Sequence, residues 1–294
     1  MKPAPFDYYA PDMREEALLL LSRYGGDAKP LAGGQSLVPS MNFRLAQPSI
    51  LVDLNGVGDL FGIHIPEEGG LRIGAMTRQR VVERSPLVRQ HAPLVSEAMP
   101  YIAHPQIRNR GTFGGSLAHA DPAAELPALA LALEAQFRVQ SSSGERMIPA
   151  ADFFLGLFTT ALEPDELLVD VTLPALPPRT GTAFEEFARR HGDYALAGVS
   201  AVVTLADDGT VSAARVVLFS VGDMPVLASS VDAMLVRVVP TTEAIDAAAE
   251  AVNADIEPQS DIHATDAYRR HIAGVLTRRV LRKAVERARG GATL

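Results

Sequence analysis

Two glycine pairs, each followed by a serine, most strongly limit how this chain can fold and what it can bind. Residues 31–36 have the sequence LAGGQS, and residues 111–116 have the sequence GTFGGS. Glycine lacks a Cβ atom, so backbone N–H groups in such segments can approach a ligand closely, and the serine hydroxyl adds a donor. One Gly-Gly pair alone is usually a flexible turn. Two similar loops in one chain suggest instead that both serve the same ligand.

The ligand that best suits these loops is a phosphate group. The segment after Ser36 can begin a helix, and the free N–H groups of a helix start favour negative charge. Neither loop matches GxGxxG, and the chain has no GxxxxGK[ST] segment, so Rossmann and P-loop sites are poor interpretations. We therefore predict that two separate loops hold the pyrophosphate of one dinucleotide cofactor.

The composition argues against several other classes of protein. With 294 residues and 47% hydrophobic side chains, the chain can bury a core large enough for two domains, or for one domain with an appendage. A formal net charge of −8 argues against non-specific binding to nucleic acid or to anionic membranes. No apolar stretch is long enough for a membrane span, and the N-terminus lacks the apolar core of a signal peptide, so we expect a cytoplasmic protein.

The chain contains no cysteine. It therefore forms no disulfides and provides no thiolate ligands for an iron–sulfur cluster or a zinc site. Any redox metal that works with this protein must be held by another chain.

Local patterns predict a mixture of helices and short strands in the first part of the chain. A helix over residues 12–24 can be capped by Asp12 and ended by the glycine pair that follows. Apolar spacing predicts another helix over residues 85–103, and residues 104–125 predict a long ordered loop because they show little periodicity. The remaining predicted elements are a small sheet of strands over residues 50–54, 62–65 and 71–77, a helix over 122–134, and strands over 136–140 and 167–174.

A proline-rich stretch, PALPPRTG over residues 174–181, marks a predicted domain boundary. Beyond it, apolar runs and an Asp-Asp-Gly turn predict a meander of antiparallel strands, followed by helices over residues 241–253 and 266–289. The basic residues of the last helix are Arg269, Arg270, Arg278, Arg279, Arg282, Lys283, Arg287 and Arg289. They form either a solvated surface or a docking face for an acidic partner.

Four stretches of the sequence together resemble one known protein family. They are LAGGQSLVPSMNFRLAQPSILVDLNGV, HPQIRNRGTFGGSLAHADPAAELPALALAL, ELLVDVTLP and RRHGDYALAGVSAVV. They resemble the FAD-binding medium subunit of molybdenum hydroxylases, the group that includes carbon monoxide dehydrogenase and xanthine dehydrogenase. The likeness runs in order from FDYYAP near the start to YRRHIAGVLTRRVLRKAVERA near the end. It is specific for the family and not for a substrate.

The resemblance implies an α+β fold with two domains. A two-part FAD-binding domain of the vanillyl-alcohol-oxidase type would cover residues 1–178. A smaller C-terminal α/β domain, with an antiparallel sheet and helices, would cover residues 179–288.

The resemblance also implies which residues bind FAD. Those around the pyrophosphate and the ribityl chain would be Leu31, Ala32, Gly33, Gly34, Gln35, Ser36, Thr112, Phe113, Gly114, Gly115 and Ser116. Glu125 stands where the family often has an aspartate that binds the cofactor, and its extra methylene lengthens the reach of the carboxylate. Leu168 matches an apolar flavin contact, and Arg190 matches a position near the flavin that is usually basic.

Two further positions place the chain closer to the carbon monoxide dehydrogenase branch by resemblance. Ile102 occupies a flavin-side position that is aromatic in the xanthine enzymes. Tyr194, in GDYALAG, matches a tyrosine that lies over the flavin ring in that branch.

Several of these residues have a simpler interpretation when the resemblance is set aside. Tyr194 could be a core aromatic residue whose hydroxyl makes one hydrogen bond, and Glu125 could favour the start of a helix. His104, His119 and Asp121 could be taken for metal ligands, but their spacing is irregular, and we predict no metal site in this chain.

The function that the resemblance implies is electron transfer. Substrate would be hydroxylated at a molybdenum cofactor in a large partner subunit, and electrons would cross two [2Fe–2S] clusters in a small subunit. The FAD of this chain would then pass electrons to a quinone, NAD or another acceptor, so the chain needs no catalytic acid or base of its own. The implied assembly is a heterohexamer, a dimer of three-chain units.

Two other functions stay open at this point. A self-contained FAD oxidase of the same fold would bind its own substrate over the flavin, and a structural subunit would have kept the fold without FAD. The substrate of the complex also stays open, since carbon monoxide, purines such as caffeine, N-heterocycles and aldehydes all suit the family.

Overall fold

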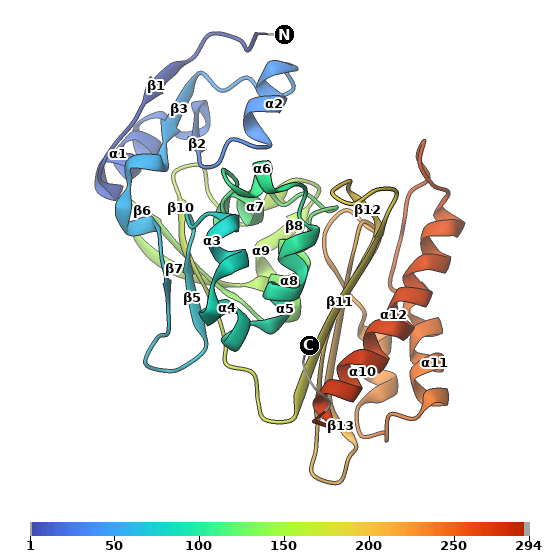
Figure 1. Cartoon of the computed structure of the whole chain (residues 1–294). Coiled ribbons are helices and arrows are strands. Elements are labelled where there is room, and N and C mark those ends of the chain that lie inside the picture. The colour runs from blue at the N-terminus through green and yellow to red at the C-terminus, as the bar shows by residue number, and fades with distance from the viewer. Residues whose placement is uncertain (1, 291–294) are drawn as a thin grey trace.

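The computed structural model describes residues 2–290, which form two blocks joined by residues 174–179 (Figure 1). The first block contains a three-stranded sheet, a five-stranded sheet and a two-stranded hairpin, with short helices around them. The second block is a four-stranded antiparallel sheet with helices. This arrangement confirms the predicted α+β fold class.

The small N-terminal sheet has the strand order β1-β3-β2, and its neighbours are parallel. Its strands are β1 (Asp7–Tyr9), β2 (Ala28–Leu31) and β3 (Ile50–Asp53), and the helices next to them in the chain are α1 (Arg14–Tyr24) and α2 (Leu37–Asn42). The expected sheet of strands over residues 50–54, 62–65 and 71–77 is therefore wrong in part. Only the last two of these pair with each other, because β3 pairs with strands that precede it in the chain.

The five-stranded sheet is antiparallel, with the order β4-β5-β10-β6-β7. Its strands are β4 (Ile63–His64), β5 (Leu71–Gly74), β6 (Gln136–Ser141), β7 (Gly144–Pro149) and β10 (Leu167–Leu173), and the nearby hairpin is β8 (Phe154–Gly156) with β9 (Thr159–Thr160). The central strand β10 has a long apolar run because both of its faces are buried. Val169 packs in the core shared with the small sheet, whereas Leu168 and Val171 pack in the main core on the other face.

Short helices cover the main core of the first block. They are α3 (Gln79–Arg84), α4 (Pro86–His91), α5 (Pro93–Ala98), α6 (Pro105–Arg108), α7 (Phe113–His119), α8 (Glu125–Ala132) and α9 (Ala150–Phe153). The single helix expected over residues 85–103 is wrong, since that segment divides into α4, α5 and a 3₁₀ turn over Met99–Tyr101. Pro86, Pro93 and Pro100 each stand at the start of a new turn, where the missing N–H is tolerated.

The long loop expected over residues 104–125 is also wrong, because it contains α6 and α7. The glycine pair in α7 lowers helix propensity and hides the helix in the sequence. The helix forms because Thr112 caps its first turn and because Phe113 and Leu117 are buried in the core.

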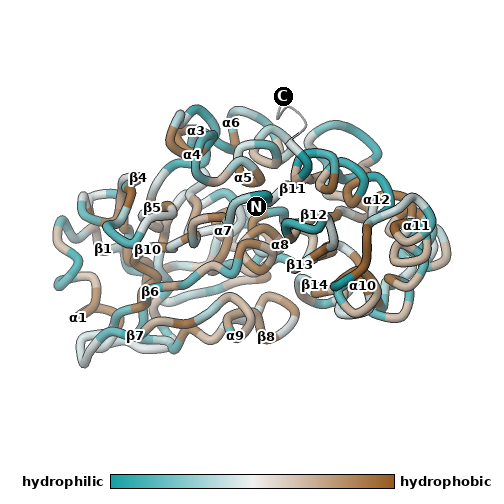
Figure 2. The backbone as a smooth tube through the Cα atoms, turned by 90° about the horizontal axis from the view of Figure 1, so that it is seen from below, coloured by the Kyte–Doolittle hydropathy of each residue, from teal (hydrophilic) through white to brown (hydrophobic). Residues whose placement is uncertain are grey.

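The second block places its sheet between two layers of helices (Figures 1 and 2). Its elements are β11 (Thr180–Ala188), β12 (Ala195–Leu205), β13 (Val211–Phe219), β14 (Val226–Leu227), α10 (Ser229–Leu235), α11 (Thr242–Ala251) and α12 (Asp266–Ala288). The predicted antiparallel meander is confirmed, while α10 is an additional helix. One face of the sheet packs on α12, and the other packs on α5 and α8 of the first block. Within residues 2–290, no helix is both long and apolar enough to cross a membrane.

The two blocks share one hydrophobic core. Phe184, Val202, Val217 and Phe219 of the second sheet lie in the same buried cluster as the helices of the first block. On the surface beside this core, Glu97 of α5 forms ion pairs of 2.5 Å and 2.7 Å with two basic residues of α12. Apolar burial therefore fixes how the blocks sit on each other, and these ion pairs add to it.

The eight basic side chains predicted on the last helix all have partners within the chain. Their carboxylate partners are Glu97, Glu185, Asp246, Glu250 and Asp261. The other partners are backbone carbonyl groups, which accept hydrogen bonds from Arg270 and Arg289 among others. Of the two interpretations of this basic face, docking on an acidic partner is therefore met largely by carboxylates of the same chain.

Candidate functional site

The two glycine loops lie against each other. Loop one (residues 31–36) connects β2 to α2, and loop two (residues 111–116) comprises the N-cap Thr112 and the first turn of α7. A Cβ atom on Gly33 would lie 2.4 Å from the carbonyl oxygen of Arg110, and one on Gly115 would lie 3.2 Å from the Cβ of Ala32. Only glycine lets the two backbones approach this closely. Segments far apart in the sequence therefore form one continuous surface.

Two polar side chains bridge the loops. Asn55 donates to the carbonyl oxygen of Ala32 in loop one at 3.0 Å, and Arg78 donates to the carbonyl oxygen of Arg110 beside loop two at 2.6 Å. Arg78 also donates to the side chain of Asn55, which completes the bridge. Neither residue is predicted from the sequence, because neither stands in a motif and their pairing exists only in the folded chain.

Loop one offers free backbone donors. The first bond of α2 runs from the N–H of Val38 to the carbonyl of Gly34. In the described chain, the N–H groups of Gly34, Gln35 and Ser36 donate no backbone hydrogen bond. Gly34 has a φ of +71°, a conformation that favours glycine. A cluster of unpaired N–H groups ahead of a helix fits a phosphate.

Loop two is different, because its backbone donors are already used. Phe113 and Gly114 donate to the carbonyl groups of Thr77 and Ala75 at 2.9 Å and 2.8 Å. The N–H of Gly115 donates to the hydroxyl of Thr112 at 3.0 Å. Loop two thus offers a ligand its side chains and a close backbone surface more than these N–H groups.

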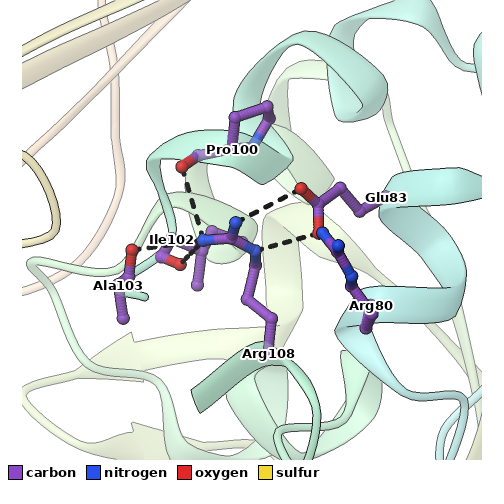
Figure 3. A network of polar contacts seen from close by, with 6 residues as sticks. All are labelled: Arg80, Glu83, Pro100, Ile102, Ala103 and Arg108. Atoms are coloured by element: carbon purple, nitrogen blue, oxygen red, sulfur yellow. Dashed lines mark hydrogen bonds and ion pairs between the residues drawn. The ribbon is translucent and has the colours of Figure 1, made fainter. Parts of the chain in front are cut away.

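Ile102 lies in a turn whose carbonyl groups accept hydrogen bonds from one buried arginine (Figure 3). Arg108, which is 4% exposed, donates to the carbonyl oxygens of Ile102 and Ala103 at 2.7 Å and 3.1 Å. Its other nitrogen atoms donate to both carboxylate oxygens of Glu83, at 3.0 Å and 3.2 Å. The side chain of Ile102 is 7% exposed and packs in the main core. Arg108 therefore holds this turn in place, a role that the sequence analysis did not assign.

Tyr194 and Arg190 lie together in the connection between β11 and β12. Tyr194 is 66% exposed, so it is not a core residue. It lines a cavity of about 650 Å³, which is also bounded by Pro122 and Ala123 of the connection between α7 and α8. Arg190 is exposed, and its carbonyl accepts a bond from the N–H of Asp193. Leu168, by contrast, is 4% exposed and packs inside the main core.

The environment of Tyr194 is concave. Removal of water from around the hydroxyl raises its pKa to about 12, with a further contribution from Asp121 and Glu125. Its ring is nevertheless mostly open to solvent. The ring is thus surrounded by protein walls but left uncovered, as expected for one side of a ligand site.

One buried carboxyl group, Glu125, and one partly buried carboxyl group, Glu186, lie close to this region. Glu125 begins α8 and is 8% exposed, and burial raises its pKa to about 7. Glu186 of β11 was not predicted as a site residue. Burial and the nearby charge of Glu125 raise the pKa of Glu186 to about 8. Both groups therefore favour the neutral form far more than an exposed glutamate does.

The residues considered as metal ligands do not form a cluster. His119 packs its ring against Phe158, with 5.0 Å between the ring centres, and burial lowers its pKa. The ring of His104 faces the backbone of Gly192. In residues 2–290, no group of three or more His, Asp or Glu side chains is placed to hold a metal ion.

The sequence matches two protein-family models along most of its length. Residues 4–176 match the FAD binding domain in molybdopterin dehydrogenase, and residues 182–284 match the CO dehydrogenase flavoprotein C-terminal domain. The chain is 45% identical to the 6-hydroxypseudooxynicotine dehydrogenase complex subunit alpha of Paenarthrobacter nicotinovorans, over 98% of this chain and 97% of that relative. It is 42% identical to the carbon monoxide dehydrogenase medium chain of Hydrogenophaga pseudoflava, over 97% and 98% of the two chains.

Solved structures agree with these matches. The carbon monoxide dehydrogenase of Hydrogenophaga pseudoflava superposes with a TM-score of 0.94, at 42% identity, over 98% of this chain and 99% of that chain. Quinoline 2-oxidoreductase from Pseudomonas putida 86 superposes with a TM-score of 0.92, at 39% identity, over 98% and 99%. The paired glycine loops and the free N–H groups of loop one suit the cofactor that this family carries. The chain therefore belongs to the FAD-binding medium subunits of the molybdenum hydroxylases.

Proposed function

We propose that this chain binds FAD along its two glycine loops and carries electrons out of a three-subunit molybdenum hydroxylase. The FAD, when bound, supplies the chemistry that links single-electron and two-electron transfer. The residues of this chain bind the cofactor, orient it and limit the access of water. The observation that carries the proposal is the contact between Gly33 of loop one and Arg110 beside loop two.

Each part of the site has a role in this proposal. The free N–H groups of loop one bind the pyrophosphate, and loop two, Thr112 to Ser116, supports the neighbouring ribityl chain. Ile102 and Tyr194 lie on opposite sides of the flavin ring, and Leu168 contributes apolar packing beneath it. Arg190 compensates negative charge on the reduced flavin, and Glu125 accepts a hydrogen bond from the cofactor.

The partners follow from the same family membership. A small subunit with [2Fe–2S] clusters delivers electrons, and a large subunit with the molybdenum cofactor oxidises the substrate. We propose a dimer of such three-chain units in the cytoplasm, with the FAD domain over residues 1–178 and the C-terminal domain over 179–288. The relatives act on compounds as different as carbon monoxide and quinoline, so the substrate is selected by another chain. The electron acceptor is a quinone, NAD or a similar molecule.

Substitution of the loop glycines tests the FAD site. In Gly115→Val, a side chain would collide with the Thr112 hydroxyl, which would lie 2.5 Å from the new Cβ. In Gly34→Val, the φ of +71° becomes strained, and the new Cβ would lie 3.2 Å from the side chain of Val38 and 3.3 Å from that of Leu31, which distorts loop one. We expect both full-length variants to lose FAD, measured by flavin absorbance after purification.

The matched control is Gly144→Val at the first residue of β7. A Cβ atom there meets nothing within 4 Å, so this variant keeps its FAD. Circular dichroism and thermal unfolding verify that each variant is folded. Full flavin content in Gly34→Val or Gly115→Val would show that the loops do not bind the cofactor.

A further inference from the structure

Tyr194 lies at the end of the hairpin loop between β11 and β12, residues 189–194. The next residue, Ala195, begins β12 and is buried in the core that both blocks share. Within the loop, the N–H of Asp193 donates to the carbonyl oxygen of Arg190 at 3.1 Å. The sheet and the core thus anchor one side of Tyr194 in the chain.

The middle of the loop rests on the first block. Gly192 has a φ of +87°, and a Cβ atom added to it would lie 2.4 Å from Cε1 of His104 and 3.0 Å from the carbonyl oxygen of Ala103. Only a residue without a side chain can approach this closely. The ring of His191 stacks on that of Tyr101, with 6.4 Å between the ring centres and 25° between the ring planes. Two neighbouring residues of the loop therefore pack on the first block.

The part of the first block beneath the loop is the turn that carries Ile102. Arg108 donates to three carbonyl groups of this turn, residues 99–103, and so holds it in place. One of these carbonyl groups is the one that meets Gly192. Tyr194 stands two positions after Gly192. The two residues proposed on opposite sides of the flavin are therefore connected by one close contact between the blocks.

The exposure of Tyr194 makes this contact important. Its ring is 66% exposed, so few contacts of its own fix where it lies. Its position depends instead on its neighbours in the chain, Ala195 in the core on one side and Gly192 against His104 on the other. Gly192 and Tyr194 also line the same cavity. A shift of the loop at Gly192 would therefore move the Tyr194 ring within the site.

We infer that Gly192 is a positioning residue, which holds Tyr194 over the flavin by letting the 189–194 loop rest on His104 and on the turn of Ile102. The inference rests on the proposed placement of the flavin ring between Ile102 and Tyr194. Gly192 acts through Tyr194 and not through a contact of its own with the cofactor.

Gly192→Ala in the full-length chain tests the contact. The new methyl group must push the loop away from His104, so we expect about fivefold weaker FAD binding and a shifted visible spectrum of the bound flavin. Fluorescence titration gives the Kd, and absorbance gives the spectrum. The double variant Gly192→Ala/Tyr194→Ala should bind FAD no more weakly than Tyr194→Ala alone. Two residues that act through one ring are not additive, whereas a general loss of stability would add to the effect of Tyr194→Ala.

Gly209→Ala is the matched control, in the turn between β12 and β13. Gly209 has a φ of +82°, but a Cβ atom there meets nothing within 4 Å. This variant has the same backbone strain without the contact, so its FAD affinity and flavin spectrum stay unchanged. His104→Ala/Gly192→Ala removes the ring that the methyl group would meet, and it should recover part of the affinity lost in Gly192→Ala. Thermal unfolding verifies that each variant is folded.

The hold on the loop is also measured without FAD. Arg189 and Arg190 are exposed at the start of the loop, so limited digestion with trypsin followed by mass spectrometry reports how readily the loop opens. We expect cleavage after these arginines to be faster in Gly192→Ala than in the unmodified chain. The rate in Gly209→Ala should not change.

These measurements separate the inference from the proposed function. If the unmodified chain binds no FAD, the proposed function fails, and the digestion still shows whether Gly192 holds the loop. The role of Gly192 alone is overturned if Gly192→Ala binds FAD as tightly as Gly209→Ala does. It is also overturned if its loss adds fully to that of Tyr194→Ala, or if cleavage of the loop is unchanged.

Discussion

Tyr194 illustrates how a single side chain can be surrounded by protein and still be open to a ligand. Its ring is 66% exposed and lines the cavity near Pro122, while its hydroxyl lies close to Asp121. A large apolar surface that stays exposed in a folded chain often marks a binding site. Here the ring is placed to cover one side of the proposed flavin position.

Substitution of Tyr194 separates the role of its ring from that of its hydroxyl. Tyr194→Phe keeps the ring, so we expect nearly normal FAD affinity and a change mainly in the rate of flavin reoxidation. Tyr194→Ala removes the ring, and we expect about tenfold weaker FAD binding, a shifted visible spectrum and faster electron loss to oxygen. Fluorescence titration gives the affinity, and stopped-flow reoxidation of the reduced complex gives the rates.

Tyr268→Ala is the comparison variant, since it removes a tyrosine that is 45% exposed on α12. It leaves the flavin spectrum and the reoxidation rates unchanged. If Tyr194→Ala behaved in the same way, Tyr194 would have no contact with the flavin.

At the scale of an element, the turn over residues 99–103 depends on one arginine. Arg108 satisfies three carbonyl groups of this turn and both oxygens of Glu83 (Figure 3). Ala103 has a φ of +44°, which an alanine rarely adopts without such support. The position of Ile102 is therefore set by a side chain that does not reach the ligand site itself.

Arg108→Ala leaves the Glu83 carboxylate with only Arg80 as a partner and leaves the carbonyl groups of the turn unpaired. We expect the free energy of unfolding to fall by about 3 kcal/mol, because a buried ion pair loses one member. Arg108→Lys keeps the charge but not the planar fork, so it loses part of this stability and also weakens FAD binding. Urea denaturation and FAD titration measure the two effects.

Arg80→Ala provides the reference for this comparison. Arg80 pairs with the same glutamate at 2.7 Å, but its side chain is 28% exposed, so its removal costs less than about 1 kcal/mol. Equal losses for Arg80→Ala and Arg108→Ala would mean that the carbonyl contacts of Arg108 add nothing.

The helices and strands of this chain also differ in how well the sequence predicts them. Strands such as β10 and β12 were predictable, because apolar runs and turn residues are local signals. Helix α7 was missed because its glycine pair opposes helix formation locally, and packing in the core overrides that preference. The glycine loops could be found from their residues, but the bridging residues Asn55 and Arg78 could not. Their roles depend on contacts between segments that only the folded chain brings together.

At the scale of the whole molecule, the chain is one part of an electron path. Its relatives are subunits of larger enzymes, and its own proposed task is to accept electrons and pass them on. We predict that the isolated full-length chain is folded and yellow but does not oxidise any substrate of the assembled enzyme. The measurement is substrate-dependent reduction of an artificial acceptor, by the chain alone and after the large and small subunits are added.

We expect substrate-dependent reduction of the acceptor once the large and small subunits are added. The isolated chain loaded with FAD is the control, because it shows that missing cofactor does not explain the lack of activity. Substrate turnover by the chain alone would instead support a self-contained FAD oxidase. Absence of flavin from a folded chain that cannot be reloaded with FAD would support a structural subunit.

The ion pairs between α12 and carboxylates of the same chain affect how this molecule associates with other proteins in salt solution. A helix whose positive groups are matched by carboxylates of its own chain projects little electric field into the solvent, and what remains is screened within about 10 Å at ordinary ionic strength. Another protein that approaches this side is therefore not drawn in by long-range attraction, and it must recognise shape and apolar surface. Complexes formed through this side will persist in salt concentrations that dissociate charge-steered pairs.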